Sequence, residues 1–266
     1  MSIVSVSGVP GGPDAPWPDV PPPMAVVDMV WPDQSNHHGT LFGGAALSML
    51  DRVAFILGSR TLRGAVVTAA VSQLDFAAPA LAGQLVECRA QVIRRGRRSV
   101  TLDATLVAES LLTGERTVCL SGEFVMVRQM DRDAQGPAQT SSLAGEQVPL
   151  PQLAREDEST VAEIVFPGHA NHRGVLHGGP AMAWMAKAGF VAATRRVRRT
   201  VVMAASDELN FKQPAHVGDV VEVSARVIAQ GKRSLQVRVH MWAECPATGV
   251  RRHCSEAKLV YVAVDA

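Results

Sequence analysis

Hydrophobic and polar positions in the first half of the chain follow the pattern of a strand, one long helix and a run of further strands. Residues 26–30 alternate in the manner of a strand. From Gly44 to about Arg60, apolar residues recur three and four positions apart over so broad a face that we expect a helix buried nearly all round. Strand-like segments follow at 66–76, 85–94, 99–109 and 117–127, with turn signals at Pro79 with Gly83, Gly96 and Thr113–Gly114 between them.

The second half of the chain repeats the first at a displacement of 135 residues. The segment 36–44, NHHGTLFGG, returns as NHRGVLHGG at 171–179. Without any gap, residues 36–128 match residues 171–263 at 35 of 93 positions, about five times what typical compositions give by chance. Loop lengths therefore agree as well as core residues, and the chain is one domain written twice.

One buried helix followed by a run of strands predicts an α+β fold, in which an antiparallel sheet wraps around the helix. We place the first domain at residues 24–129 and the second at 160–266. Residues 1–23 are rich in glycine and proline and are expected to form a flexible leader without the features of a signal peptide. Residues 130–159 lack periodicity and are expected to be the interdomain linker.

Composition narrows the classes of partner. Lysine and arginine number 26 against 25 acidic residues, so the chain has no general attraction for nucleic acid or anionic membranes. No apolar run reaches the ~18 residues of a membrane span, and the four cysteines are too scattered for a disulfide framework or a zinc site. Cys119 and Cys254 occupy matching strand-like segments and are expected to be buried packing residues. We therefore expect a cytoplasmic protein with no nucleic-acid or membrane partner.

The glycine pair at each helix start and one carboxylate carry the candidate chemistry. A helix start without side chains offers unpaired N–H groups and the positive end of the helix dipole to an oxygen that gains negative charge. Asp51 lies seven residues after Gly44, two helical turns on, and so projects from the same face. An acid on an apolar helix is costly unless it is solvated, paired or used. From position alone, a structural aspartate and a catalytic one both remain open.

These residues resemble a known family. The string Asn-x-x-Gly-x-x-x-Gly-Gly, an apolar helix with aspartate seven residues on, and the segment from Val66 to Gly83 are similar to the hotdog-fold acyl-CoA thioesterases, some of which are tandem double hotdogs. The resemblance covers roughly residues 26–128 and 161–263. It implies two hotdog domains in tandem and hydrolysis of an acyl-CoA thioester without a cofactor or a metal.

In that family each active site lies between two hotdog units, with an asparagine from one unit and an aspartate from the other. Carried over, the resemblance pairs Asn171 with Asp51, and the N–H of Gly178 or Gly179 would hold the thioester oxygen. Asp51 would activate a water or attack the thioester itself. The other site would have Asn36, Gly43 and Gly44, but Ala186 stands where its aspartate should be. We therefore expect one working site per chain and one degenerate site.

Histidines and basic turns complete the candidate set. His177 is expected to contact substrate, with a loop residue bonded to backbone groups as the alternative; His37 and His172 match each other and could simply set the loop. The turns between the long strands of each copy suit the phosphates of coenzyme A, although a solvated turn is the alternative. The residues concerned are Arg94, Arg95, Arg97 and Arg98 in the first copy and Lys232 and Arg233 in the second.

Two other functions stay open beside thioester hydrolysis. An enoyl-CoA hydratase of the same fold would use a histidine paired with an acid, and the sequence lacks the spacing of that pair. A non-enzymatic acyl-CoA-binding or regulatory module would be consistent with the loss of one carboxylate. The resemblance also implies that double-hotdog chains can associate into a homo-oligomer.

Overall fold

The structure, a computed structural model, describes residues 20–129, 158–207 and 209–264. Most of the expected leader (1–19) and most of the expected linker (130–157) lie outside the described residues.

The first copy contains one strand, one helix and four more strands, in the order expected from the hydrophobic pattern. The elements are β1 (Met24–Met29), α1 (Gly43–Leu62), β2 (Val66–Phe76), β3 (Leu85–Arg95), β4 (Ser99–Glu109) and β5 (Arg116–Arg128). Helix α1 ends at Leu62, and the next residue, Arg63, adopts the left-handed conformation of a C-terminal cap with φ 50°. Both ends of this helix lie within two residues of the predicted ones.

The second copy repeats this order, with one strand divided in two. Its elements are β6 (Glu158–Ile164), α2 (Gly178–Val197), β7 (Val201–Ser206), β8 (Leu209–Phe211), β9 (Val220–Gln230), β10 (Ser234–Glu244) and β11 (Arg251–Ala263). Strands β7 and β8 together correspond to β2. Strand β6 begins two residues before the expected start of the domain, because Glu158 and Ser159 already pair with β9.

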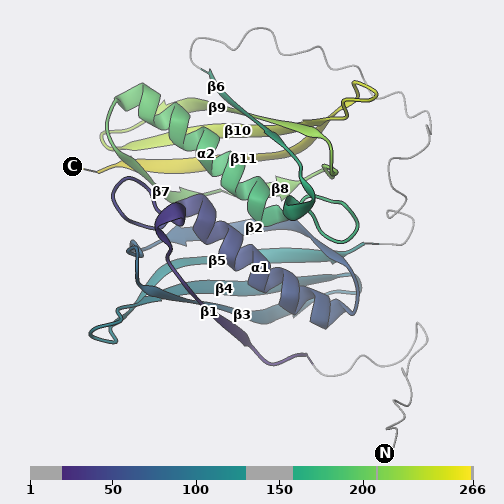
Figure 1. Cartoon of the computed structure of the whole chain (residues 1–266), viewed down its shortest axis with the longest axis horizontal. Helices are drawn as coiled ribbons and strands as arrows, with labels where there is room; N and C mark the ends of the chain where they lie inside the picture. The colour runs from purple at the N-terminus through teal and green to yellow at the C-terminus, as the bar shows by residue number, and fades with distance from the viewer. Residues whose placement is uncertain (1–19, 130–157, 208, 265–266) are drawn as a thin grey trace, which may run out of the picture.

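All the strands join into one antiparallel sheet, in the order β1-β3-β4-β5-β2-β7-β11-β10-β9-β6. The copies meet where β2 pairs with β7, at Leu74 with Ser206 and Asp75 with Ala205, and β8 pairs with both β11 and β2. Both helices lie on the same face of this sheet, side by side (Figure 1). The chain is therefore an α+β protein of two hotdog domains that share one sheet.

Helices α1 and α2 are antiparallel and approach each other closely through small residues. A Cβ atom on Gly44 would lie 2.8 Å from the Cα of Ala183, and one on Gly179 would lie 3.0 Å from the Cα of Ser48. Neither position can accept a side chain without moving the opposite backbone. The N-terminus of each helix consequently packs against the first two turns of the other helix, which brings residues of both copies to each helix start.

The rest of the core agrees with the sequence pattern. Cys119 and Cys254 are buried, as expected, and no cysteine is in a disulfide. In the part of the chain that the structure describes, no helix combines the length and apolar character needed to cross a membrane.

Candidate active site

Asp51 of the first copy binds the start of the helix of the second copy. Its side chain is buried, with 2% of the residue exposed. The Thr68 hydroxyl donates a hydrogen bond to Oδ1 at 2.6 Å, and the Gly179 N–H donates one to Oδ2 at 2.7 Å. The carboxylate therefore lies at the positive end of the α2 dipole, held by one group from each copy.

The glycine pair at the start of α2 is required by this contact. A Cβ on Gly178 would lie 2.6 Å from the Thr68 Oγ1 and 2.8 Å from the Asp51 Oδ1. The sequence predicts that these glycines admit a ligand, whereas in the structure the aspartate and threonine of the other copy occupy that place. The Gly179 N–H is also already bonded to Asp51. Of the two glycine N–H groups, only that of Gly178 lacks an acceptor within the described residues.

Burial changes the acidity of Asp51. Desolvation raises the pKa of its carboxyl from 3.8 to about 6, against the opposing effects of the Thr68 and Gly179 hydrogen bonds. No cation is paired with it among the described residues, so neither an ion pair nor an arginine accounts for this buried acid. The group is mostly ionised at neutral pH and can take up a proton close to that range, as a general base requires.

We expect the raised pKa of Asp51 to make the unfolding free energy of the protein depend on pH. Because the pKa of Asp51 is higher in the folded chain than its ordinary value, the native state binds more protons between about pH 4 and pH 6. Unfolding free energy should fall across that window as pH rises, by roughly 2–3 kcal/mol from this group. Chemical denaturation of wild type and Asp51→Asn at pH 4.5 and 7.5 measures it. The variant should gain stability relative to wild type at the higher pH, and a pH-independent difference would contradict the shift.

Asn171 differs from its counterpart Asn36 in what its amide nitrogen contacts. Both side-chain oxygens organise their loops: the Asn171 Oδ1 accepts the N–H groups of Arg173 and Val175 at 2.9 and 3.2 Å. The Asn36 Nδ2 donates to the Thr40 hydroxyl at 2.8 Å. Valine replaces this threonine in the second copy, and within the described residues the Asn171 Nδ2 has no acceptor. The amide beside α2 is thus free to donate to a ligand.

His177 lies at the same helix start. It is the residue that precedes α2, and its ring packs edge-on against Phe55 of α1, with centroids 4.8 Å apart. Burial, and secondarily the charge of His172, lowers the pKa of His177, so the ring is neutral at neutral pH. His37 instead packs against His38 and Phe190, on the side of the other helix start. The structure therefore places His177, and not His37, with Asp51.

The second helix start has lost both polar partners. Ala186 occupies the position of Asp51, as the sequence indicated, and Met203 occupies the position of Thr68. A Cβ on Gly43 would meet the ring of Phe76 at 3.2 Å and Met203 at 3.4 Å, where Gly178 meets the threonine and the acid. Sequence reasoning missed Thr68, although the threonine-to-methionine difference between the copies was a signal for it.

The basic turns divide between the two sides. In the first copy, Val100 of β4 and Thr68 of β2 both pair with Met126, so the turn carrying Arg97 and Arg98 lies at the end of the sheet that holds Asp51. In the second copy, Leu235 and Met203 both pair with Tyr261, which puts Lys232 and Arg233 on the side of Met203 and Ala186. Arg94 and Arg98 bond Thr101 and the Arg128 carbonyl at 3.4 Å, and Arg233 bonds the Ala263 carbonyl.

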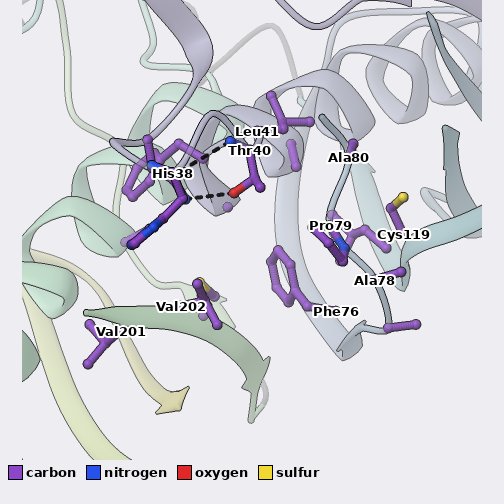
Figure 2. Close-up of a pocket in the computed structure, with 18 of the residues that line it drawn as sticks. His38, Thr40, Leu41, Phe76, Ala78, Pro79, Ala80, Cys119, Val201 and Val202 are labelled. Atoms are coloured by element: carbon purple, nitrogen blue, oxygen red, sulfur yellow. Dashed lines mark hydrogen bonds between the residues drawn. The ribbon is translucent and has the colours of Figure 1, made fainter. Parts of the chain in front are cut away.

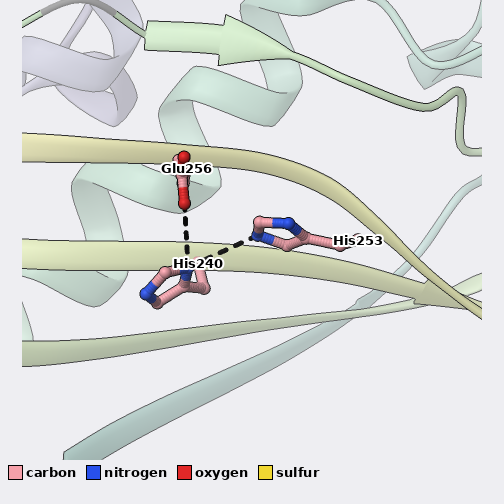
Figure 3. A group of neighbouring side chains, drawn as sticks. All are labelled: His240, His253 and Glu256. Atoms are coloured by element: carbon pink, nitrogen blue, oxygen red, sulfur yellow. Dashed lines mark hydrogen bonds and ion pairs between the residues drawn. The ribbon is translucent and has the colours of Figure 1, made fainter. Parts of the chain in front are cut away.

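The fold also assembles three ligating side chains that the sequence did not connect. His240, His253 and Glu256 gather on strands β10 and β11, with the His240 Nδ1 3.3 Å from the His253 Nε2 and 3.7 Å from the Glu256 Oε2 (Figure 3). A bulge after Met241 helps to put these side chains on one face. Lys212 already pairs with Glu256 at 2.6 Å. The matching first-copy residues are Thr105, Val118 and Ser121, so the group is separate from the duplicated site.

Curated proteins similar to this chain are thioesterases. Mouse acetyl-coenzyme A thioesterase is 24% identical over 89% of this chain and 50% of its own length, and mouse acyl-coenzyme A thioesterase 11 is 26% identical over 92% and 48%. The chain thus spans about half the length of these two relatives. Human cytosolic acyl coenzyme A thioester hydrolase is 21% identical over 93% of this chain and 76% of its own length.

One solved structure and one family model are also similar to this chain. An acyl-CoA hydrolase from Agrobacterium tumefaciens is 36% identical, covers 92% of this chain and 96% of its own, and superposes with a TM-score of 0.41. The family model described as the thioesterase superfamily matches residues 38–115 and again residues 173–250, one segment in each copy. Because these two matches cover more than half of the sequence, the chain belongs to the thioesterase superfamily.

Proposed function

We propose that this chain hydrolyses acyl-CoA thioesters at one composite site, built by Asp51 of the first copy and by Asn171 and Gly178 of the second. The observation that carries the proposal is the buried carboxylate of Asp51 bonded to the Gly179 N–H across the two copies. The names of the curated relatives, which are acyl-CoA thioesterases or hydrolases, support the same reaction and substrate class.

In the proposed reaction, Asp51 takes a proton from a water whose oxygen attacks the thioester carbonyl carbon. The C–S bond then breaks, and the departing thiolate of coenzyme A receives a proton, which leaves a free acid and a free thiol. The carbonyl oxygen gains charge in between, and the unpaired Nδ2 of Asn171 and N–H of Gly178 are suited to stabilise it. Direct attack by the carboxylate of Asp51 remains the alternative route through the same residues.

The proposal assigns turnover to one side only. The other helix start keeps Asn36, Gly43 and Gly44 but has Ala186 and Met203 in place of the acid and the hydroxyl. Neither alanine nor methionine can take the proton from water. For the phosphates of the substrate we propose Arg94, Arg95, Arg97 and Arg98, because their turn lies at the working end of the sheet. Lys232 and Arg233 occupy the corresponding turn of the second copy, and we propose that they could contact phosphates only on the degenerate side.

We also propose that the protein is cytoplasmic and that its chains associate. A cytoplasmic location agrees with the name of the human relative, a cytosolic acyl coenzyme A thioester hydrolase. Further association of these chains into a homo-oligomer stays a prediction of the family resemblance.

Release of free thiol from a panel of acyl-CoA substrates tests the proposed reaction. With Asp51 as the base, kcat should rise with pH through a midpoint near pH 6 and level off about one unit higher, because the carboxyl must be ionised to accept a proton. A flat profile between pH 5 and 8 would argue against a catalytic role for this acid. Tight binding of acyl-CoA without thiol release would favour a non-enzymatic binding module, and hydration of an enoyl-CoA would favour a hydratase.

Chelation should leave hydrolysis unchanged. Among the described residues, the only group of three or more potential ligands is His240 with His253 and Glu256, and Asp51 is not part of it. The hydrogen bonds that position Asp51 come from Thr68 and Gly179, neither of which needs a metal. We expect kcat to stay within about twofold after dialysis against EDTA. A loss that zinc restores, and that His240→Ala reproduces, would show that the outer cluster holds a functional metal.

A further inference from the structure

The degenerate helix start opens into an apolar cavity that lies between the copies. Its volume is about 400 Å³, within the range of small-molecule pockets. Phe76, Pro79 and Cys119 from the first copy lie across this cavity from Val201 and Val202 of the second (Figure 2). Ala186 and Phe190 of α2 also line it.

The cavity includes the place that an aspartate would occupy. On the working side, Asp51 and Thr68 fill the space before α2, and the Gly179 N–H is bonded to the acid. On the degenerate side, Ala186 lines the cavity together with Gly43, and within the described residues the N–H of Gly43 has no acceptor. An oxygen-bearing ligand can supply the acceptor that the protein lacks here, at the positive end of the α1 dipole.

The mouth of the cavity is basic. A second hollow of about 600 Å³ shares Phe190 and Val264 with the first, and it is lined also by His37, Arg198 and Arg199. These arginines follow the C-terminus of α2, whose dipole they complement, but the hollow beside them gives them a further possible partner. A ligand that fills both hollows would have an apolar body and an anionic end.

We propose that this cavity is a second acyl-binding site, which holds the acyl chain of an acyl-CoA or of a free fatty acid without hydrolysing it. The proposal rests on the proposed function, since it takes the ligand class from the working site related to this one by the duplication. The apolar walls suit the hydrocarbon chain, the Gly43 N–H suits its carbonyl or carboxylate oxygen, and Arg198 suits the charged end. Substrate and product share this chemistry, so the test separates them.

Titration calorimetry on the full chain measures how many ligand molecules bind to each chain. The ligands are a non-hydrolysable thioether analogue of dodecanoyl-CoA and, separately, dodecanoate. We expect two equivalents of the analogue per wild-type chain. Val202→Trp should fill the degenerate cavity from β7 and leave one equivalent, with kcat within about twofold of wild type. The matched change in the first copy, Val67→Trp, should instead remove the equivalent bound at the working site and lower hydrolysis.

If Val202→Trp does not fold, a charge variant at the surface, Arg198→Asn, provides a second test of the same site. Arg198 is exposed and has φ 52°, which asparagine tolerates better than most residues. Arg198→Asn should weaken binding at the second site about fivefold, while Arg63→Asn, at the corresponding end of α1, leaves that site unchanged. Dodecanoate that binds only to chains with an open cavity identifies the product as a ligand, and binding of the analogue alone identifies the substrate.

One equivalent in wild type, with affinity unaltered by Val202→Trp and by Arg198→Asn, would overturn the second site even if hydrolysis is observed. Two equivalents, one of them removed by Val202→Trp, in a chain that releases no thiol from any acyl-CoA would sustain the second site and reject the proposed function.

Discussion

Replacing Asp51 with asparagine is expected to lower kcat for acyl-CoA hydrolysis by about 10²–10⁴-fold, the range that a positioned general base contributes. Asparagine has nearly the same shape but cannot accept a proton from water at neutral pH. Of the two corresponding helix positions, 51 and 186, only the first carries an acid, because the counterpart of Asp51 is Ala186. The corresponding residue of the second copy therefore cannot take its place. Thiol release at saturating substrate measures the loss.

Thermal unfolding and a second variant separate a chemical role from a structural one. Asp51→Asn should fold at least as well as wild type at pH 7.5, because the buried charge is gone. Thr68→Val removes the hydroxyl that bonds the acid and should lower kcat about tenfold. It should also move the midpoint of the pH profile upward, since that hydrogen bond lowers the pKa of Asp51. Wild-type turnover in folded Asp51→Asn would reject the proposed mechanism.

The duplication explains why so much of the fold was predictable. Because the copies align without a gap, each hydrophobic pattern was read twice, and the ends of α1 were predicted within two residues. The division of β2's counterpart into β7 and β8 was not predicted. The second copy has Ser206 and Asp207 where the first has Val71 and Ser72, and the Ser206 hydroxyl bonds the carbonyl of Asp207 instead of continuing the strand. A local side-chain bond of this kind leaves little trace in periodicity.

The candidate site was harder to predict than the fold, because it forms where the two copies pack against each other. Asp51 was identified because a lone acid stands out on an apolar helix. Its bond to Thr68 was not predicted, because that bond depends on the register of β2 under α1, which residue spacing does not specify. The role of Gly178 was interpreted too narrowly for a similar reason. Its missing Cβ makes room for a side chain of the other copy, and only the docked copies show this.

The asymmetry of the asparagines was visible in the sequence but its meaning was not. Thr40 and Val175 are matching residues, and the difference between them resembles ordinary drift between repeats. In the structure this one change decides whether the neighbouring amide nitrogen is occupied by a hydroxyl or is left to donate. The site that kept its acid is also the site whose asparagine is free, so two independent differences point to the same working side.

Removing the Asn171 amide should accordingly cost far more than removing that of Asn36. We expect Asn171→Asp to lower kcat by about 10²–10³-fold, the effect of losing one donor to a charged transition-state oxygen, and Asn36→Asp to change it less than about twofold. Aspartate keeps the side-chain oxygen that accepts the N–H groups of Arg173 and Val175, so the loop is preserved and only the free donor is lost. Thiol-release kinetics for the two variants measure the contrast.

The new charge in Asn171→Asp would raise the pKa of Asp51, which could by itself lower turnover at neutral pH. Assays up to pH 9 separate the two effects: a loss caused by protonation of Asp51 disappears at high pH, whereas a loss of the donor persists. Asn171→Ala provides a neutral comparison and should be at least as impaired. Equal losses in the Asn36 and Asn171 variants would mean that both helix starts contribute to turnover. The pairing of Asn171 with Asp51, and with it the single composite site, would then be wrong.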